Sequence, residues 1–278
     1  MASVTQRINN IKQPRGGYIR PSTLTSLVMN DEIILNEKEN IHGTLIGMAV
    51  DYLTRFEMGS KISDAFSISL KGAKAAQTFG VKPALKVADQ LAKGIKNLDN
   101  LSITNACKLV TFDAWYRNPF GAMTAKGYDE INPDEPTIEN IRTLVNRGKA
   151  FFEDFGPITK DGFTFDPEDA STLDYEKMII GIGNYGGYTP TVNAGDGDFI
   201  TKDTLWDFKV SKSTPTNKHT LQLLMYWIMG QHSGQKIFKS ITKIGIFNPR
   251  LNTVYTLDIA NIPNDIISTV ESNVIGYL

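Results

Sequence analysis

The stretch GDGDFITKDTLWDFKVSK, residues 195–212, holds the residues on which the fold and the chemistry of this chain depend. It predicts two short strands, the first with Asp198 and the second with Asp207 and Lys209, joined by a turn over Thr201–Thr204. Because side chains alternate along a strand, Asp207 and Lys209 point to one face and the aromatic residues beside them to the other. We therefore expect two carboxylates and one ammonium group to meet at the end of a hairpin.

These three side chains suit a hard divalent cation such as Mg²⁺ or Mn²⁺. Carboxylates supply oxygen ligands, and Mg²⁺ usually keeps several waters and takes substrate phosphates at its remaining positions. Water bound to such an ion beside an ammonium group loses a proton readily and can attack a phosphodiester. The alternative is an ordinary surface ion pair between Asp207 and Lys209, without a catalytic role.

Residues 217–230, NKHTLQLLMYWIMG, predict a helix that follows the hairpin and ends at Gly230. Gln222 and Tyr226 lie four positions apart, so they share one face of this helix. The apolar residues around them would bury the helix against the sheet, and core packing alone is the alternative role for Tyr226. His219, at the start of the helix, is expected to help cap it, with a phosphate contact as the alternative.

The ordered set Asp198, Asp207-x-Lys209 and Gln222-x-x-x-Tyr226 resembles the signature of the PD-(D/E)XK nuclease superfamily. The Gln-x-x-x-Tyr spacing is similar to that of its RecB-like branch. The resemblance implies an α/β (α+β) fold with a restriction-endonuclease-like core, a central mixed sheet flanked by helices, and a helical N-terminal or inserted region. It also implies a Mg²⁺- or Mn²⁺-dependent deoxyribonuclease, a phosphodiester hydrolase of phage, mobile-element or repair and recombination processes.

The same resemblance implies a role for each motif residue. Asp198 and Asp207 would bind the metal together with the main-chain carbonyl of Phe208. Lys209 would orient or activate the attacking water and stabilise charge on the phosphate. The pair Gln222 and Tyr226 would hold the substrate backbone or the lysine in place. The resemblance implies DNA as the substrate, and the motif itself leaves open single or double strands and DNA or RNA.

An upstream helix is a further part of the resemblance. Residues 46–53, IGMAVDYL, are similar to an element that supplies a histidine or an acid to the metal in the RecB-like branch. Asp51 stands at that position, where the branch more often has histidine, and is a candidate metal ligand. Alternatively, Asp51 pairs with Arg55 one helical turn further on, a surface contact worth about 0.3–0.5 kcal/mol.

The chain divides by composition into four segments. Residues 1–29 are polar, basic and interrupted by proline and glycine, which predicts a flexible basic arm. Residues 30–58 are expected to hold the first core helix, and residues 59–157 a helical insertion. Residues 158–278 are expected to form the nuclease-like α/β core, which closes with a helix over residues 263–274.

Charge is nearly balanced in total but unevenly distributed. The chain has 29 Lys+Arg and 30 Asp+Glu, a formal net charge of −1. Residues 201–250 contain eight basic and two acidic residues, and Lys212, Lys218 and Arg250 among them are candidate contacts for DNA phosphates. Residues 129–176 contain thirteen acidic and four basic residues, which would confine DNA to the opposite side of the protein.

Composition also excludes several kinds of site. Cys107 is the single cysteine, so an internal disulfide, a cysteine-based zinc site and a cysteine-ligated iron–sulfur cluster are excluded. The longest apolar run is about ten residues, roughly half of what crosses a bilayer. We therefore expect a cytoplasmic protein that binds no membrane, and the resemblance implies DNA as its partner.

Two other functional classes fit the same sequence. A catalytically inactive nucleic-acid-binding protein with the same fold would hold DNA through phosphate contacts and would be indifferent to a chelator. A partner-binding protein would use the acidic residues 129–176 as a DNA mimic or a docking face. Divalent-cation binding near Asp198 and Asp207 distinguishes a nuclease from the inactive binder.

Overall fold

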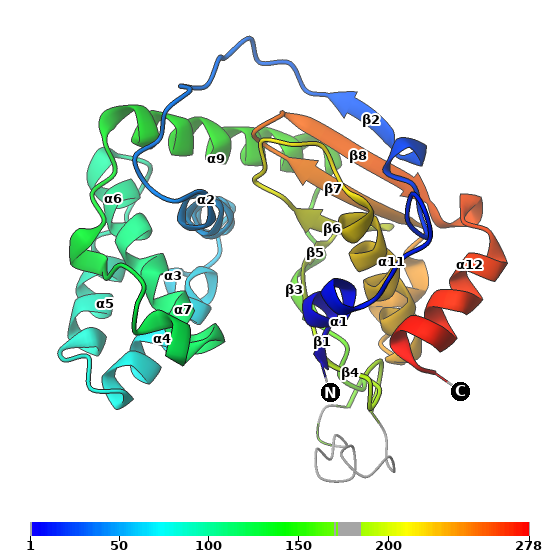
Figure 1. Cartoon of the computed structure of the whole chain (residues 1–278). Coiled ribbons are helices and arrows are strands. Elements are labelled where there is room, and N and C mark those ends of the chain that lie inside the picture. The colour runs from blue at the N-terminus through cyan, green and yellow to red at the C-terminus, as the bar shows by residue number, and fades with distance from the viewer. Residues whose placement is uncertain (1, 170, 172–184, 278) are drawn as a thin grey trace. The chain divides into compact units, whose positions relative to one another are not determined.

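The structure of the chain is a computed structural model that describes residues 2–169, 171 and 185–277 (Figure 1). The chain forms two compact units. The sheet unit consists of Met1–Met29 and Phe152–Leu278, and the helical unit consists of Asn30–Phe151. The sheet is mixed and is accompanied by helices, which confirms the α/β class expected from the sequence.

The strands of the sheet unit form one large and one small sheet. The six-stranded sheet has the order β2 (Thr25–Val28), β8 (Thr253–Asp258), β7 (Lys243–Asn248), β6 (Thr204–Phe208), β5 (Asp196–Ile200) and β3 (Lys160–Thr164) (Figure 1). In this sheet β6 and β7 run parallel, whereas the other neighbouring pairs are antiparallel. In the small sheet, β1 (Ala2–Ser3) pairs in parallel with β4 (Val192–Ala194).

The hairpin expected from residues 195–212 is present as β5 and β6. Phe199 lies opposite Trp206, and the Thr201 amide donates a hydrogen bond of 3.0 Å to the Thr204 carbonyl across the turn. Parallel strands need a crossover connection, and α11 (Asn217–His232) supplies it between β6 and β7. The order hairpin, helix, strand is therefore the one predicted.

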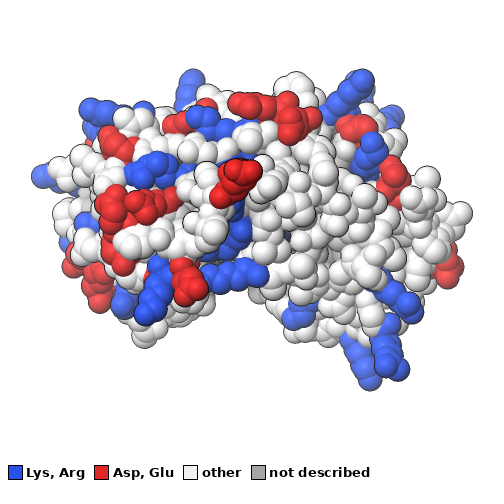
Figure 2. All heavy atoms as spheres, turned by 90° about the horizontal axis from the view of Figure 1, so that it is seen from above, with Lys and Arg blue, Asp and Glu red and all other residues white. Residues whose placement is uncertain are grey.

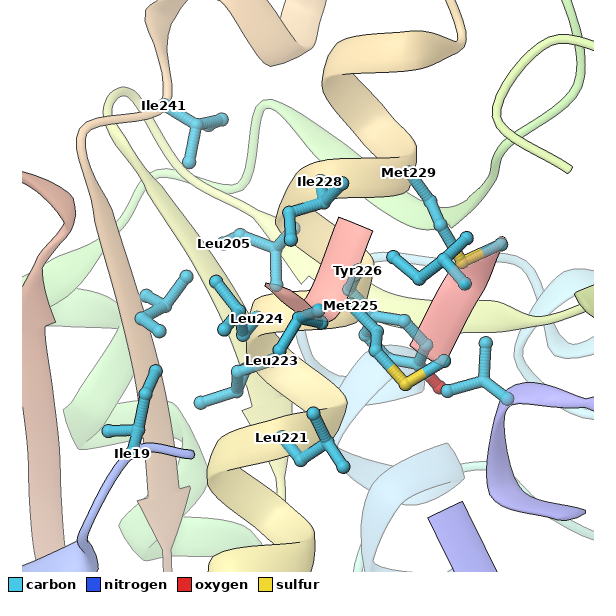
Figure 3. Packing of buried hydrophobic residues seen from close by; sticks show 14 of the residues in the cluster. Ile19, Leu205, Leu221, Leu223, Leu224, Met225, Tyr226, Ile228, Met229 and Ile241 are labelled. Atoms are coloured by element: carbon cyan, nitrogen blue, oxygen red, sulfur yellow. The ribbon is translucent and has the colours of Figure 1, made fainter. Parts of the chain in front are cut away.

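Helix α11 provides much of the apolar core on one face of the sheet. It is apolar nearly all round, which is typical of a helix buried in a core. Figure 3 shows Leu221 and Leu224 of α11 in this cluster together with Leu205 of β6 and Ile19 of the N-terminal segment. The core therefore joins residues that lie about two hundred positions apart in the chain.

Residues 1–29 are not the flexible arm that their composition predicts, because they form part of the sheet unit. Val4 and Ile8 of α1 (Val4–Asn10) are buried in its core, and Ile19 and Leu24 are buried there as well. The average polarity of the segment conceals these four apolar side chains. Their burial depends on partners far along the chain, which local composition does not reveal.

Polar contacts also hold this N-terminal segment in place. Arg7 donates hydrogen bonds to the main-chain carbonyls of Val274 at 2.8 Å and Asn273 at 2.9 Å. Further on, β2 pairs with β8 in antiparallel register and becomes an edge strand of the six-stranded sheet. Arg7, one of the basic residues of the predicted flexible arm, is thus engaged within the protein.

Replacing Ile8 with alanine is expected to lower the free energy of unfolding by about 2–5 kcal/mol, since a buried side chain is removed and a cavity remains. Urea denaturation measures the change. The control is Lys12→Ala at an exposed position, which should alter the stability by less than about 0.5 kcal/mol. Wild-type stability in Ile8→Ala would show that this segment does not belong to the core.

The sheet unit closes with the helix predicted near the C-terminus. α12 (Asn264–Thr269) continues into a π-helical segment, Val270–Ile275, that buries Val270 and Val274. Gly276 ends the segment with φ of 91°, a left-handed conformation that glycine adopts without steric cost. Short 3₁₀ helices in the same unit are Pro21–Thr23, Lys236–Ser240 and Ile259–Asn261.

The helical unit contains the helices expected in the first half of the chain. They are α2 (Gly43–Glu57), α3 (Ile62–Ala65), α4 (Ser67–Thr78), α5 (Ala84–Lys93), α6 (Asn100–Leu109), α7 (Asp113–Arg117), α8 (Pro119–Ala122) and most of α9 (Glu135–Phe155), with 3₁₀ helices at Val110–Phe112 and Tyr128–Glu130. Among the described residues, no helix combines the length and the apolar character needed to cross a membrane.

Close contacts hold α2, α4 and α7 together. A Cβ atom at Gly72 of α4 would lie 1.9 Å from the carbonyl oxygen of Phe112, so this approach requires glycine. Asp113, at the start of α7, is buried and accepts hydrogen bonds from the hydroxyls of Tyr52 in α2 and Ser69 in α4. One carboxylate therefore links three helices.

Helix α2 forms where the first core helix was expected, but it belongs to the helical unit. It buries Ile46, Val50 and Leu53, and it contacts α6 and the 3₁₀ helix Val110–Phe112. The expected boundary between residues 58 and 59 is therefore wrong, since the helical unit begins at Asn30. Amphipathic spacing predicts a helix and its buried face, but it does not predict which element covers that face.

Candidate active site

The candidate active site lies on the β5–β6 hairpin and the neighbouring face of α11. Phe199 and Trp206 pair across the hairpin, and their rings stack on one face of the sheet. Because side chains alternate along a strand, Asp198 and Asp207 point to the opposite face. The two carboxylates therefore lie on the same side of the hairpin.

A main-chain hydrogen bond orients Asp198. The Phe208 amide donates to Asp198 Oδ2 at 2.6 Å, so the carboxylate of β5 is held against the end of β6. Asp198 is half-buried, whereas its neighbour across the hairpin, Asp207, is buried. The carbonyl of Phe208 belongs to the same short stretch of β6 and is the third oxygen donor named by the sequence.

Asp207 and Lys209 form an ion pair, with 3.0 Å between Asp207 Oδ1 and Lys209 Nζ. The Asp207 side chain is 4% exposed and that of Lys209 is 28% exposed, so the ammonium group lies nearer to solvent than the carboxylate. Trp206 packs on the opposite face against Phe199 and Phe155, with ring centroids 6.4 Å and 5.6 Å away. The alternation along β6 thus brings the acid and the lysine together.

Gln222 and Tyr226 lie on the face of α11 that carries this chemistry. Gln222 Nε2 donates a hydrogen bond of 2.8 Å to the Tyr226 hydroxyl, as expected for residues one helical turn apart. Burial raises the pKa of Tyr226 well above its usual value, and the charges of Asp207, Asp198 and Asp196 raise it further. The hydroxyl therefore keeps its proton and faces a group of carboxylates.

Asp196 is a site residue that the sequence analysis did not single out. Its charge acts on Tyr226 together with those of Asp198 and Asp207. Asp196 and Asp198 are two positions apart on β5, so they point to the same face. The alternation of side chains along a strand, which placed Asp207 and Lys209 on one face, also places Asp196 on the same face as Asp198.

His219 caps α11 and also lies near Lys209. Its Nδ1 accepts a hydrogen bond of 3.2 Å from the Thr216 amide, which confirms the expected capping role. Because Nδ1 accepts, the proton of the neutral ring is on Nε2. Burial, followed by the positive charge of Lys209, lowers the pKa of His219 to about 4. His219 lies three residues before Gln222 and seven before Tyr226, so the three side chains share one face of the helix.

The depressed pKa of His219 makes the stability of the protein depend on pH. Between about 4 and its ordinary value of 6.5, the unfolded chain binds a proton at His219 and the folded protein does not. The free energy of unfolding should therefore decrease as the pH falls through this range. Over this pH range the free energy of unfolding should decrease less in His219→Gln than in wild type. The difference between the two decreases should be on the order of 1 kcal/mol after allowance for solvent screening.

Urea denaturation of both proteins, above and inside this pH range, measures the difference. Comparison with wild type at each pH removes the contributions of the carboxylates, which both proteins share. Identical pH dependence in the two proteins would contradict the lowered pKa.

The basic residues named by the sequence differ in their surroundings. Asn248, at the end of β7, accepts hydrogen bonds at Oδ1 from the amides of Ser211 and Arg250, which ties the loop after Lys209 to the β7–β8 turn. Lys212 follows in that loop and is exposed. Lys218 Nζ instead donates to Asn9 Oδ1 at 2.8 Å in the N-terminal helix. Phosphate contacts by these three cations stay a prediction.

Figure 2 shows how charged side chains lie on one face of the molecule. Aspartate and glutamate side chains lie there interspersed with lysine and arginine side chains. A DNA mimic requires a continuous array of negative charge, because duplex DNA carries a regular array of phosphates. The role of residues 129–176 as a DNA mimic or a docking face stays a prediction.

Asp51 forms the local pair that was the alternative to metal binding. Arg55 Nε and Asp51 Oδ1 are 2.9 Å apart, and both side chains are partly buried. Both residues belong to α2 in the helical unit, whereas the hairpin residues belong to the sheet unit. Metal ligation by Asp51 stays a prediction.

The oxygen donors of the hairpin fit a hard cation with few protein ligands. Among the described residues, no group of three or more His, Cys, Asp or Glu side chains is arranged to hold a metal ion. Mg²⁺ is commonly bound by one or two carboxylates, with waters and substrate phosphates at its other positions. Asp198, Asp207 and the Phe208 carbonyl therefore match what such an ion takes from a protein.

The site as a whole combines oxygen acceptors with cationic and neutral donors. Asp196, Asp198 and Asp207 are the acceptors, and an ammonium group, a carboxamide, a phenol and an imidazole surround them. This combination suits a phosphate group that is bound through a cation and hydrogen-bonded at its remaining oxygens. In comparisons with known proteins, no family model, curated protein or solved structure matched this chain.

Proposed function

We propose that this protein is a metal-dependent nuclease of the PD-(D/E)XK type, most similar to the RecB-like branch, that hydrolyses phosphodiester bonds in DNA. One observation carries the proposal. Asp198, Asp207 and Lys209 meet on one face of the β5–β6 hairpin, beside the hydrogen-bonded pair Gln222 and Tyr226. An ordinary surface ion pair does not explain why Asp207 is buried, nor why its charge and that of Asp198 both act on the Tyr226 hydroxyl.

In this proposal the carboxylates hold the ion. The ion, Mg²⁺ or Mn²⁺, would be bound by Asp198, Asp207 and the Phe208 carbonyl. It would act as a Lewis acid that withdraws negative charge from a phosphate. The Phe208 amide holds the Asp198 carboxylate against the end of β6, so this ligand is oriented before any ion binds. Preorganised ligands of this kind reduce the reorganisation needed during the reaction.

Lys209 would act on the reacting phosphate and the water. Its ammonium group is held by Asp207 but is the more exposed member of the pair, so it can reach a substrate at the surface. It would orient the water and stabilise negative charge that develops on the phosphate. Removing one such donor usually costs about 10²–10³ in rate.

Gln222 and Tyr226 would position groups around the reacting centre. The Tyr226 hydroxyl accepts its hydrogen bond from Gln222, which leaves its own proton for an acceptor in the site. The raised pKa of Tyr226 keeps that proton in place at neutral pH, so the residue acts as a donor and not as a base. The role is therefore to hold an acceptor oxygen, from a carboxylate or from the DNA backbone.

Incubation with labelled DNA tests the function directly. Linear and circular substrates, single- and double-stranded, are exposed to the purified protein with Mn²⁺ or with EDTA. We expect cleavage with Mn²⁺ and none with EDTA, and the linear and circular arms separate exonuclease from endonuclease activity. Binding that weakens with salt, ignores the chelator and gives no cleavage on any substrate would favour the inactive nucleic-acid-binding protein.

A further inference from the structure

The helical unit contains a cavity that the proposed nuclease function does not use. Its volume is about 660 Å³, and every lining residue lies between Asn40 and Asn132. The walls come from the start of α2, from the segment Val110–Arg117, and from the loop between α8 and α9. Small-molecule sites in proteins typically have volumes of about 300–1,000 Å³, so the cavity is large enough for a ligand.

Aliphatic side chains form the apolar part of the wall. Helix α2 contributes Leu45 and Met48, and the segment just before it contributes Ile41. The rest of this surface comes from Val110 and Ile131. Among the described lining residues there is no Phe, Tyr or Trp. Bases and other flat rings are usually held by stacking on aromatic side chains, so this wall favours an aliphatic body over a nucleobase.

The two acidic residues of the wall already serve the protein. Asp113 is buried and accepts hydrogen bonds from Tyr52 at 2.6 Å and from Ser69 at 2.5 Å, and burial raises its pKa. Glu130 Oε2 accepts a hydrogen bond of 2.9 Å from the Gly127 amide. Neither carboxylate therefore needs a cationic ligand.

The basic residues of the wall lie at its exposed side. Arg117 and Lys126 line the cavity, and both are exposed to solvent. A guanidinium carries five N–H donors, so Arg117 can act on the neighbouring Asp113 and still bind an anionic group. The first turn of α2, which also lines the cavity, contains no acidic residue that would oppose an anion.

We propose that this cavity binds a small aliphatic anion, with its apolar chain against Leu45, Met48 and Ile131 and its anionic head group beside Arg117 and Lys126. The buried chain would supply most of the affinity, because each CH₂ group removed from water strengthens binding about fourfold. The two cations would select a negative head group over a neutral or positive one. The proposal does not depend on the nuclease function, because every lining residue belongs to the helical unit.

Calorimetric titration of the full chain with three eight-carbon probes tests this proposal. Octanoate, 1-octanol and octyltrimethylammonium have the same chain and differ in the charge of the head group. We expect octanoate to bind saturably to one site per chain, about tenfold or more tighter than octyltrimethylammonium, with 1-octanol between them. No saturable octanoate binding, or equal affinity for the cationic probe, would overturn the proposal.

Matched variants locate the binding site. Arg117→Gln combined with Lys126→Gln should weaken octanoate binding about fivefold or more and leave 1-octanol binding within about twofold. The control combines Lys74→Gln with Lys86→Gln, which removes the same charge from exposed positions of the same unit and should change nothing. Equal effects in the two double variants would show that net charge, and not the cavity, governs binding.

A third variant fills the cavity. Ala114→Phe places a large side chain in the wall and should abolish binding of octanoate and 1-octanol. Circular dichroism reports whether this variant is folded. If it is not folded, the double variant Arg117→Gln with Lys126→Gln provides the test, because both of its positions are exposed. Unchanged octanoate binding in a folded Ala114→Phe protein would exclude this cavity as the site.

Discussion

Asp207→Asn is expected to abolish metal-dependent DNA cleavage, with a fall in rate of about a thousandfold or more. Asparagine has nearly the same shape but no charge, so it is a poor ligand for a hard cation. The substitution also removes the carboxylate that lies 3.0 Å from the ammonium group of Lys209, so the lysine loses its anchor. Single-turnover rates on a labelled DNA substrate with Mn²⁺ measure the loss.

Asp203→Asn is the matched control for this experiment, since it makes the same change in the turn of the same hairpin. Asp203 lies 3.6 Å from Lys243 and its side chain is 46% exposed, so the rate should stay within about twofold of wild type. Mn²⁺ should raise the melting temperature of the wild type and of Asp203→Asn but not of Asp207→Asn.

Cleavage by Asp207→Asn at the wild-type rate would refute the metal-binding role of that residue. A similar loss in Asp203→Asn would instead indicate a defect in the hairpin as a whole. The melting temperatures without metal distinguish a folding defect from a lost ligand.

Trp206→Ala is expected to lower the free energy of unfolding by about 3–5 kcal/mol. Trp206 is 1% exposed, and its ring packs between Phe199 and Phe155 on the face of the sheet opposite Asp207. Its Nε1 also donates a hydrogen bond of 2.9 Å to Thr201 Oγ1 at the turn. Removal of the ring leaves a cavity under the hairpin that carries the candidate site, and equilibrium denaturation measures its effect.

Trp206→Phe is the control, because it keeps an aromatic ring and removes the indole N–H. The lost hydrogen bond and the smaller ring should cost about 1–2 kcal/mol, clearly less than the alanine substitution. A loss below about 1 kcal/mol in Trp206→Ala would show that this face of β6 is not packed as described. A protein unfolded by Trp206→Ala would agree with the expected magnitude, since whole domains are stable by only about 5–15 kcal/mol.

The parts of the site that the sequence predicts depend on backbone geometry within a few residues. Trp206, Asp207 and Phe208 alternate along one strand, and Gln222 and Tyr226 lie one turn apart on one helix. Strand and helix periods are properties of the local chain, so these relations hold wherever the elements pack.

The parts that the sequence does not predict depend on contacts between distant segments. The burial of Ile8 and Ile19 requires a core built largely from residues beyond Phe152, and the assignment of α2 to the helical unit requires α6. Composition over a window of residues contains no information about either partner. An average over residues 1–29 therefore predicts an arm, whereas the structure contains a helix and an edge strand.

By itself, the sequence determined the elements and their chemistry: a hairpin with acids and a lysine on one face, followed by a helix with glutamine and tyrosine on one face. Only the tertiary structure decided how deeply Asp207 is buried and that a cavity opens beside Asp113. It also decided that burial, and after it the charge of Lys209, lowers the pKa of His219. The physical reason is that burial, electrostatic coupling and enclosed volume arise from the surfaces that meet in space. Alternation and helical spacing arise from the covalent chain alone.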